Sequence, residues 1–292
     1  MSFAIVTDSP ANLPLDLICR HGLMVIPFSY CLNGQEHTCL APEAFPAADF
    51  FQAMKQQTVL STSMIPPQQF VAHWEPLLKA GLDVLFVSLS AGISSSYASA
   101  QMAAAQLLTR YPDRNIRLVD SLGASLGEGL LVLRACALRA QGVDLNQTAD
   151  TLLSLRRRIC QLFTVDDLLY LKRGGRLSGA AAVLGTLLNL KPILKGSDQG
   201  TIVLSGKARG RTHAIQALAQ RYEAFAVYPG DQIVGIAHGN CPEDAAALAA
   251  LLRRVKPPKE ILTVCFEPVT GAYAGPGALA LFFEGGNEVR LQ

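Results

Sequence analysis

The chain has 292 residues, of which half are hydrophobic and only 16% are charged, and its net charge is +2. This length suits two ordinary domains, and so apolar a composition excludes an intrinsically disordered chain. A net charge of +2 is too small for the excess of basic residues that is typical of a nucleic-acid-binding protein. We therefore expect a folded protein of two domains with no nucleic-acid partner.

The sequence gives no sign of export or of membrane insertion. Residues 1–10 (MSFAIVTDSP) lack a basic start and reach Asp8 at once, unlike a secretory signal. The most apolar stretches, 130–138 and 180–188, are too short for a membrane helix. The seven cysteines are scattered and form no CxxC pair, so we expect reduced thiols rather than a metal site. The prediction is a cytoplasmic protein with no membrane span and no cofactor.

The first half of the chain alternates short apolar runs with helix-like segments. This alternation indicates a mainly parallel sheet flanked by helices, with ligands bound at the carboxyl ends of the strands. Residues 25–36 differ, because their period-2 pattern around Asn33-Gly34 predicts an antiparallel hairpin arm near residues 24–40. The predicted strands are 3–6, 84–87 and 116–119, and the predicted helices are 94–108, 125–139 and 148–158.

A second pattern begins near residue 160, where helices interleave with hairpin-like strands. Such a pattern predicts a mixed α/β sheet in a separate domain. The expected domains are therefore 1–160 and 161–292. The predicted strands are 159–165, 190–195, 201–205, 233–237, 260–265 and 278–283, and the predicted helices are 166–171, 214–223 and 242–255.

Small hydroxyl residues gather at the predicted strand ends of the first half. Hydroxyls and free N–H groups at helix starts bind carboxylates and phosphates, although the same residue types also cap helices. A cap explains any one of them more simply, whereas several clusters together indicate an anion site. The clusters contain Thr7, Ser9, Thr62, Ser63, Ser88, Ser90, Ser94, Ser95, Ser96 and Ser121.

The sequence indicates no nucleophile with its base. It contains no HExxH, Walker A or G-x-G-x-x-G run, and we expect no G-x-S-x-G nucleophile elbow. Among the five histidines, His238 at the end of a predicted strand is the one with a plausible site role. We therefore expect no catalytic residues.

The stretch from Lys172 to Arg211 carries eight basic residues and a single acid, Asp198. It is either a solvated face or a surface that meets an anionic partner or a phosphate, and both interpretations stay open. The loop Arg173-Gly174-Gly175-Arg176 fits phosphate contact better than mere solvation, because glycine can adopt positive φ.

Seven motifs are spread along the whole chain: VTDSPANLP (6–14), TSMIPPQQF (62–70), SSSYASA (94–100), VDSLGASLGEGLL (119–131), LLYLKRGGRLSG (168–179), LNLKPIL (188–194) and AGPGALALFF (274–283). In this order and spacing they make the chain resemble the DegV family from end to end. That resemblance implies a two-domain α/β protein that holds one long-chain fatty acid in an apolar tunnel near the domain junction. It also implies a binding subunit that presents the carboxylate to a separate ATP-binding fatty acid kinase subunit.

The resemblance also assigns residues. It places the carboxylate against Thr62 and Ser63 on one side, and against Ser94, with its neighbours Ser95 and Ser96, on the other. It places Arg173, Arg176 and Arg209 on the face used toward the kinase subunit.

Three positions depart from the family pattern. Tyr273-Ala274 replaces His-Thr before Gly-Pro-Gly, Ser95 replaces a glycine, and Ile65-Pro66 replaces Pro-Ser. Tyr273 can still donate a hydrogen bond to the head group, so we include it among the ligand-binding residues.

The expected function is therefore fatty acid binding without catalysis. Two alternatives stay open: a small-molecule phosphotransfer or hydrolytic enzyme, and a lipid sensor without a kinase partner.

Overall fold

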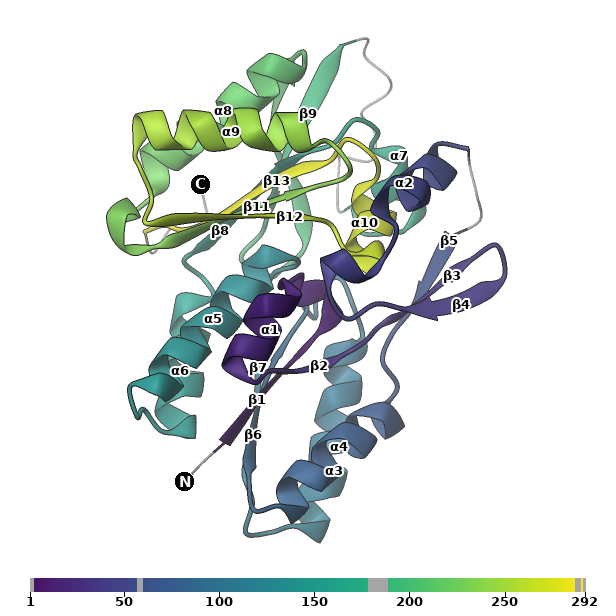
Figure 1. Cartoon of the computed structure of the whole chain (residues 1–292), viewed down its shortest axis with the longest axis vertical. Coiled ribbons are helices and arrows are strands. Elements are labelled where there is room, and N and C mark those ends of the chain that lie inside the picture. The colour runs from purple at the N-terminus through teal and green to yellow at the C-terminus, as the bar shows by residue number, and fades with distance from the viewer. Residues whose placement is uncertain (1–2, 57–59, 178–188, 287–289, 291–292) are drawn as a thin grey trace.

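The computed structural model describes residues 3–56, 60–177, 189–286 and 290. The apolar stretch 180–188 and the last two residues of the LLYLKRGGRLSG motif lie outside these ranges. Figure 1 shows a lower part built on one sheet and an upper part built on another, with helix α5 between them. Within the described ranges, every helix falls short of the length and hydrophobicity that a membrane span requires.

The lower sheet is parallel throughout, as predicted. Its strand order is β2-β1-β6-β7, and every pair in it is parallel. Successive residues of a strand face opposite sides, so in β6 Leu85 packs toward α5 and α6 while Phe86 packs toward α3 and α4. The elements are β1 (Phe3–Asp8), β2 (Met24–Ile26), β6 (Asp83–Ser88), β7 (Ile116–Asp120), α3 (Pro67–Lys79), α4 (Ser96–Arg110), α5 (Leu126–Ala140) and α6 (Leu145–Leu155).

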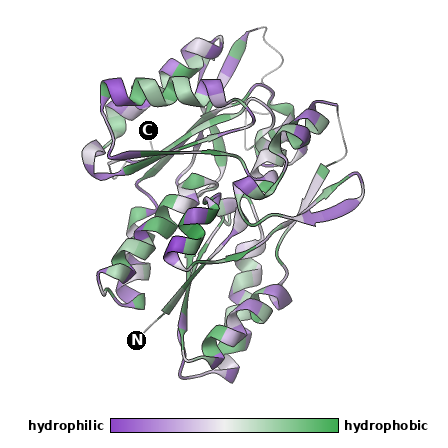
Figure 2. Ribbon diagram, viewed as in Figure 1, coloured by the Kyte–Doolittle hydropathy of each residue, from purple (hydrophilic) through white to green (hydrophobic). Residues whose placement is uncertain are grey.

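The arm is a three-stranded antiparallel sheet in the order β4-β3-β5. Asn33 and Gly34 both have positive φ, 53° and 81°, which confirms the predicted tight turn. The arm starts later than predicted, because residues 24–26 pair in parallel with β1, where Ile26 is buried in the core. Strand β4 is exposed along its whole length, and Figure 2 shows its polar colouring. The strands are β3 (Ser29–Leu32), β4 (Gln35–Thr38) and β5 (Leu60–Ser63).

The upper sheet is mixed, as predicted, with strand order β10-β9-β8-β13-β11-β12. Only β11 and β12 pair in parallel among its described strands. Helices α8 and α9 cover one face, and α5 packs on the other (Figure 1). The elements are β8 (Ile159–Thr164), β9 (Leu190–Gly196), β10 (Ile202–Arg209), β11 (Ile233–His238), β12 (Glu260–Cys265), β13 (Leu279–Glu284), α8 (Arg211–Phe225) and α9 (Pro242–Val255).

Several helices are absent from the sequence prediction or displaced from it. Four of them have nine residues or fewer, and a short helix gives only a weak signal of hydrophobic periodicity. Helix α7 begins three residues later than predicted, after the polar Asp166-Asp167. Helix α10, which carries Tyr273, was not predicted at all. The helices are α1 (Leu15–His21), α2 (Ala47–Lys55), α7 (Leu169–Arg173) and α10 (Pro268–Ala274); α3 was also missed.

Candidate functional site

A mostly apolar pocket lies between the two sheets. It encloses about 880 Å³ of space, including the part open to solvent. One wall is the lower face of the upper sheet, where Phe163 of β8 lies opposite Ala280 of β13, and Gln161 lies opposite Phe282. The other walls come from the turns that follow β6 and β7 and from α10. Further apolar lining residues are Phe28, Leu89, Ile93, Leu122, Leu171, Phe266 and Val269.

Two segments distant in sequence bring hydroxyls to one end of this pocket. Thr62 lies on β5, and Ser94 lies in the turn between β6 and α4; both line the pocket. The buried Ser96 hydroxyl accepts a hydrogen bond from the Ile65 N–H (3.0 Å) and another from Ser94 Oγ (3.2 Å). Because Ile65 follows Thr62 by three residues, this buried bond fixes the two segments side by side.

Tyr273 of α10 completes this end of the pocket. Its phenol oxygen lies 2.5 Å from Thr62 Oγ1, at hydrogen-bonding distance. The guanidinium of Arg176 stacks on the Tyr273 ring at 4.6 Å from the centroid, and its Nε donates to the Ile93 carbonyl (3.1 Å). On Gly174, a β-carbon would lie only 2.2 Å from the ring. The loop around Gly174 thus supports the tyrosine by stacking and by the space that glycine leaves.

A second, more polar cavity adjoins this end. Thr62, Arg176 and Tyr273 line both cavities, so they stand at the boundary between them. Arg173 and Tyr170 line the outer cavity but not the apolar pocket. A ligand with its head group at the Thr62–Tyr273 pair would therefore face two arginines across that boundary.

A buried cap orients α10. Glu267 accepts hydrogen bonds from the N–H groups of Val269 (2.7 Å) and Thr270 (2.5 Å) at the start of the helix. Asn12, in the loop after β1, accepts from the Glu267 N–H (3.0 Å). Burial raises the pKa of the Glu267 carboxyl. This cap links the first sheet to the helix that carries Tyr273.

The other predicted head-group residues do not line the pocket. Ser63 and Ser95 are exposed, and Ser95 Oγ donates to the sulfur of Met64 (2.9 Å). Ser96 is fully buried in the bonds already described. A role for these three serines in holding a ligand stays a prediction.

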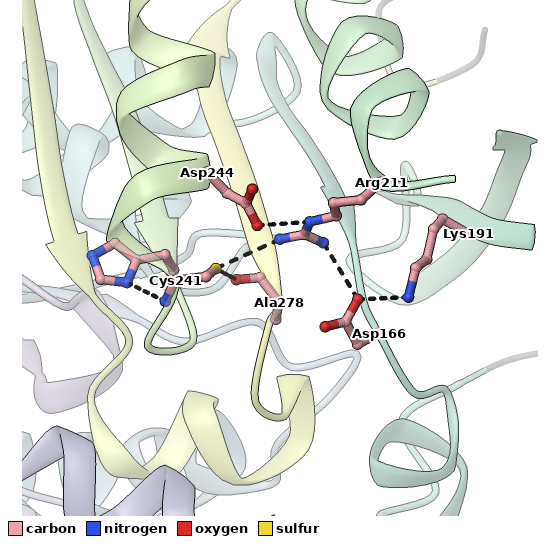
Figure 3. Close-up of polar contacts among 7 residues, drawn as sticks. Asp166, Lys191, Arg211, Cys241, Asp244 and Ala278 are labelled. Atoms are coloured by element: carbon pink, nitrogen blue, oxygen red, sulfur yellow. Dashed lines mark hydrogen bonds and ion pairs between the residues drawn. The ribbon is translucent and has the colours of Figure 1, made fainter. Parts of the chain in front are cut away.

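Part of the predicted basic surface is bonded to carboxylates or to a backbone carbonyl. Asp166 lies 2.6 Å from the Lys191 ammonium and 3.8 Å from the Arg211 guanidinium, which also bonds Asp244 at 2.8 Å (Figure 3). Lys195 donates to a backbone carbonyl, that of Arg290. Both acids lie outside the stretch 172–211, so counting charge along the sequence overestimated the excess.

Four basic residues of that stretch stay exposed, and the salt bridges found within the described ranges do not include them: Lys172, Arg173, Lys207 and Arg209. Arg173 borders the outer cavity, whereas Arg209 does not line either cavity.

His238 lies outside the pocket. Its Nδ1 accepts from the Cys241 N–H at 3.3 Å. Burial lowers the pKa of this histidine, which favours its neutral form. The histidine acts here as a local turn contact, and its predicted site role finds no support in the geometry.

A pair of buried carboxyls lies beneath the pocket. Asp8 Oδ2 accepts from the N–H of Leu89, a pocket residue (3.1 Å), and Glu128 Oε1 accepts from Thr7 Oγ1 (2.7 Å). Burial raises the pKa of Asp8 to about 7 and that of Glu128 well above its usual value, and the charge of Asp8 raises the pKa of Glu128 further. Two carboxyls buried close together favour a state in which one of them keeps its proton.

Ser125 and Gln161 are pocket residues that our sequence interpretation missed. Ser125 occupies the centre of the run Gly123-Ala124-Ser125-Leu126-Gly127, which has the G-x-S-x-G form and could have been found by motif alone. Gln161 carried no such signal, because a polar residue in a predicted strand is ordinarily exposed.

Comparison with known proteins agrees with this architecture. The family model described as "Uncharacterised protein, DegV family" matches residues 2–285. The chain belongs to the DegV family. A DegV domain-containing protein of Clostridium perfringens is 34% identical over 283 residues, which cover 97% of both chains.

Two solved DegV structures share the whole fold. A DegV protein of Thermus thermophilus, whose structure is described as one of fatty acid binding, has a TM-score of 0.89 and 32% identity over 98% of this chain and all of its own. DegV of Bacillus subtilis, described as a fatty acid binding protein, has a TM-score of 0.85 and 29% identity at the same coverage. The two-domain α/β architecture predicted for this DegV protein is therefore confirmed.

Proposed function

We propose that this DegV protein binds one long-chain fatty acid in the pocket, with the carboxylate at Thr62, Ser94 and Tyr273. The observation that carries the proposal is a mostly apolar pocket bordered at the Thr62–Tyr273 pair by a cluster of hydroxyls from three separate elements. The fatty acid binding of the Thermus thermophilus and Bacillus subtilis relatives supports it.

The energetics suit this ligand. Burying about 14 methylenes at roughly 0.8 kcal/mol each gives up to about 11 kcal/mol, from which the costs of association and ordering are subtracted. The head group then needs only to be hydrogen-bonded and oriented. Hydroxyl donors do this without burying a positive charge of their own.

We further propose that the protein presents this carboxylate to a separate ATP-binding fatty acid kinase subunit and does not transform it alone. The adjoining outer cavity supports the proposal. It meets the pocket at the head-group end, and Arg173 and Arg176 border it. Paired arginines suit phosphate contacts.

Native mass spectrometry of the purified full-length protein tests the binding proposal. We expect the mass of one fatty acid per chain, released on organic extraction and identified by gas chromatography. A chain recovered empty that also takes up no labelled fatty acid would contradict the proposal.

A further inference from the structure

Ser125 stands on a strained turn between β7 and α5. Its backbone has φ 52° and ψ −140°, a region that residues other than glycine rarely adopt. The side chain is 1% exposed and lines the pocket. Strained backbone of this kind is typical of functional sites.

Gln161 holds this turn from the opposite sheet. Its Oε1 accepts from the Ala124 N–H (3.1 Å), and its Nε2 donates to the Leu122 carbonyl (3.1 Å). A β-carbon on Gly123 or on Gly127 would lie 2.6 Å from the Gln161 amide. Both glycines of the G-x-S-x-G run therefore make room for an amide that fixes the serine between them.

The hydroxyl of Ser125 keeps a proton free for a ligand. Asn12 Nδ2 donates to Ser125 Oγ (3.0 Å) and to the Cys265 carbonyl (3.2 Å), while Asn12 Oδ1 accepts from Glu267. The serine oxygen is thus the acceptor in its bond to Asn12. Among the residues that the structure describes, no acceptor is found for its proton.

Thr270 adds a second hydroxyl to the pocket lining. Its buried Oγ1 can donate to the Glu267 carboxylate, and no donor to this oxygen is found within the described ranges. Buried polar groups without partners are rare, and a ligand hydroxyl could accept from Ser125 and donate to Thr270.

This geometry does not suit nucleophilic attack. A serine nucleophile needs a neighbouring base that takes its proton. The side chain bonded to Ser125 is the amide of Asn12, which donates to the serine oxygen and cannot accept its proton. The hydroxyls of Ser125 and Thr270 instead suit an oxygen atom on the ligand.

The position of this wall along the pocket follows from α10. Thr270 precedes Tyr273 by three residues, so it lies on the same helix face about 5 Å nearer the helix start. An acyl chain with its carboxylate at the Thr62–Tyr273 pair would run past Thr270 and Ser125. We propose that Ser125 and Thr270 form an oxygen-binding subsite along the acyl chain, which makes the pocket prefer long-chain acids with a hydroxyl or oxo group at one chain position.

This inference rests on the proposed function, because it assumes the carboxylate at the Thr62 end. The test uses the delipidated full-length protein and compares stearate with a series of hydroxystearates that differ in the hydroxyl position. Affinity is measured by displacement of a fluorescent fatty acid. Because one hydrogen bond is gained, we expect one hydroxystearate isomer to bind about fivefold more tightly than stearate.

The variants separate the subsite from the rest of the pocket. Ser125→Ala and Thr270→Val should each reduce the positional preference and leave stearate affinity within about twofold, since neither hydroxyl meets a plain chain. Ser121→Ala is the matched control, because Ser121 is buried in the same turn, bonds the Gly123 carbonyl and does not line the pocket. It should keep the preference. Thr270 lies outside the strained turn, so Thr270→Val can still test the positional preference if Ser125→Ala folds poorly.

Three outcomes would overturn the inference. Equal affinity for stearate and every isomer would remove the subsite and leave the proposed function standing. A preference that survives in both variants would place the contact elsewhere. Labelling of Ser125 by a fluorophosphonate would show a nucleophile instead of a donor. Failure to bind stearate and every isomer would instead contradict the proposed function itself, and the subsite with it.

Discussion

The Thr62 hydroxyl and the Tyr273 phenol lie 2.5 Å apart although 211 residues separate them in the sequence. Their contact joins β5 of the arm to α10 and closes the apolar pocket at one end. Either oxygen can be the donor in this bond, so a carboxylate arriving here can accept from both once the bond between them opens.

Tyr273→Phe should weaken fatty acid binding by about 10-fold or more, because it removes a hydrogen bond to a charged acceptor. The aromatic ring and its stacking with Arg176 remain, so the melting temperature should hardly change. Displacement of a fluorescent fatty acid measures the affinity. Tyr170→Phe, which removes a phenol from the outer cavity, is the control and should bind normally. Unchanged affinity of the Tyr273 variant would place the carboxylate elsewhere.

A double-mutant cycle tests whether Thr62 and Tyr273 act together. Thr62→Val keeps the side-chain shape and should by itself lower affinity by a factor similar to that of Tyr273→Phe. Because the two hydroxyls bond each other, the double variant should lose less than the sum of the two single losses. Strict additivity would show that the groups act independently.

Gly174→Ala should displace Tyr273, since the new methyl group would lie 2.2 Å from its ring. We expect weaker fatty acid binding together with a changed near-ultraviolet circular dichroism signal. Gly230→Ala is the control, because a β-carbon there meets nothing within 4 Å. A normal affinity for the Gly174 variant would mean that the ring relaxes without cost to the site.

The buried Asp8–Glu128 pair should make stability fall as pH rises. The pKa of Asp8 is raised from 3.8 to about 7 in the fold, and that of Glu128 is raised as well. The folded chain therefore keeps protons that the unfolded chain has released, and the free energy of unfolding decreases between about pH 4 and pH 7, by up to about 1.4 kcal/mol per pH unit for each such proton.

Urea denaturation at several pH values measures this dependence. Glu128→Gln should make the decline shallower, because the amide carries no charge and its oxygen can still accept from Thr7. Glu75→Gln, at a half-buried acid of α3 whose pKa is lowered, should leave the decline in place. An unchanged slope in the Glu128 variant would show that the pair does not hold the proton.

Arg173→Ala should slow acyl phosphate formation by a reconstituted kinase pair and leave the fatty acid content unchanged, because Arg173 borders the outer cavity and not the pocket. Added salt should slow the parent pair more than the variant pair, since charge pairs at an interface rim are screened. Arg134→Ala, at an exposed arginine on α5, is the control. A parent protein that binds fatty acid but never yields acyl phosphate with the kinase subunit of its own host would leave a sensing or storage role.

The sequence alone predicted the elements whose signals are local. The alternation of apolar runs with helical segments predicted the parallel sheet, and Asn33-Gly34 predicted the turn of the arm, because periodicity and turn chemistry act over a few residues. The ordered motifs, the hydroxyl clusters around Thr62 and Ser94, and the Tyr273 replacement pointed to the end of the pocket before any contact was known.

Only the tertiary structure decided which of these groups meet. Asp166 and Asp244 neutralise part of the basic stretch from positions outside it, and Gln161 enters the pocket from the opposite sheet to hold the turn of Ser125. Such contacts join residues that are far apart in the chain, and no local pattern encodes them, because they form only when both sheets pack around α5. The strain at Ser125 has the same origin, since its positive φ is held by the surrounding packing and not by its own preference.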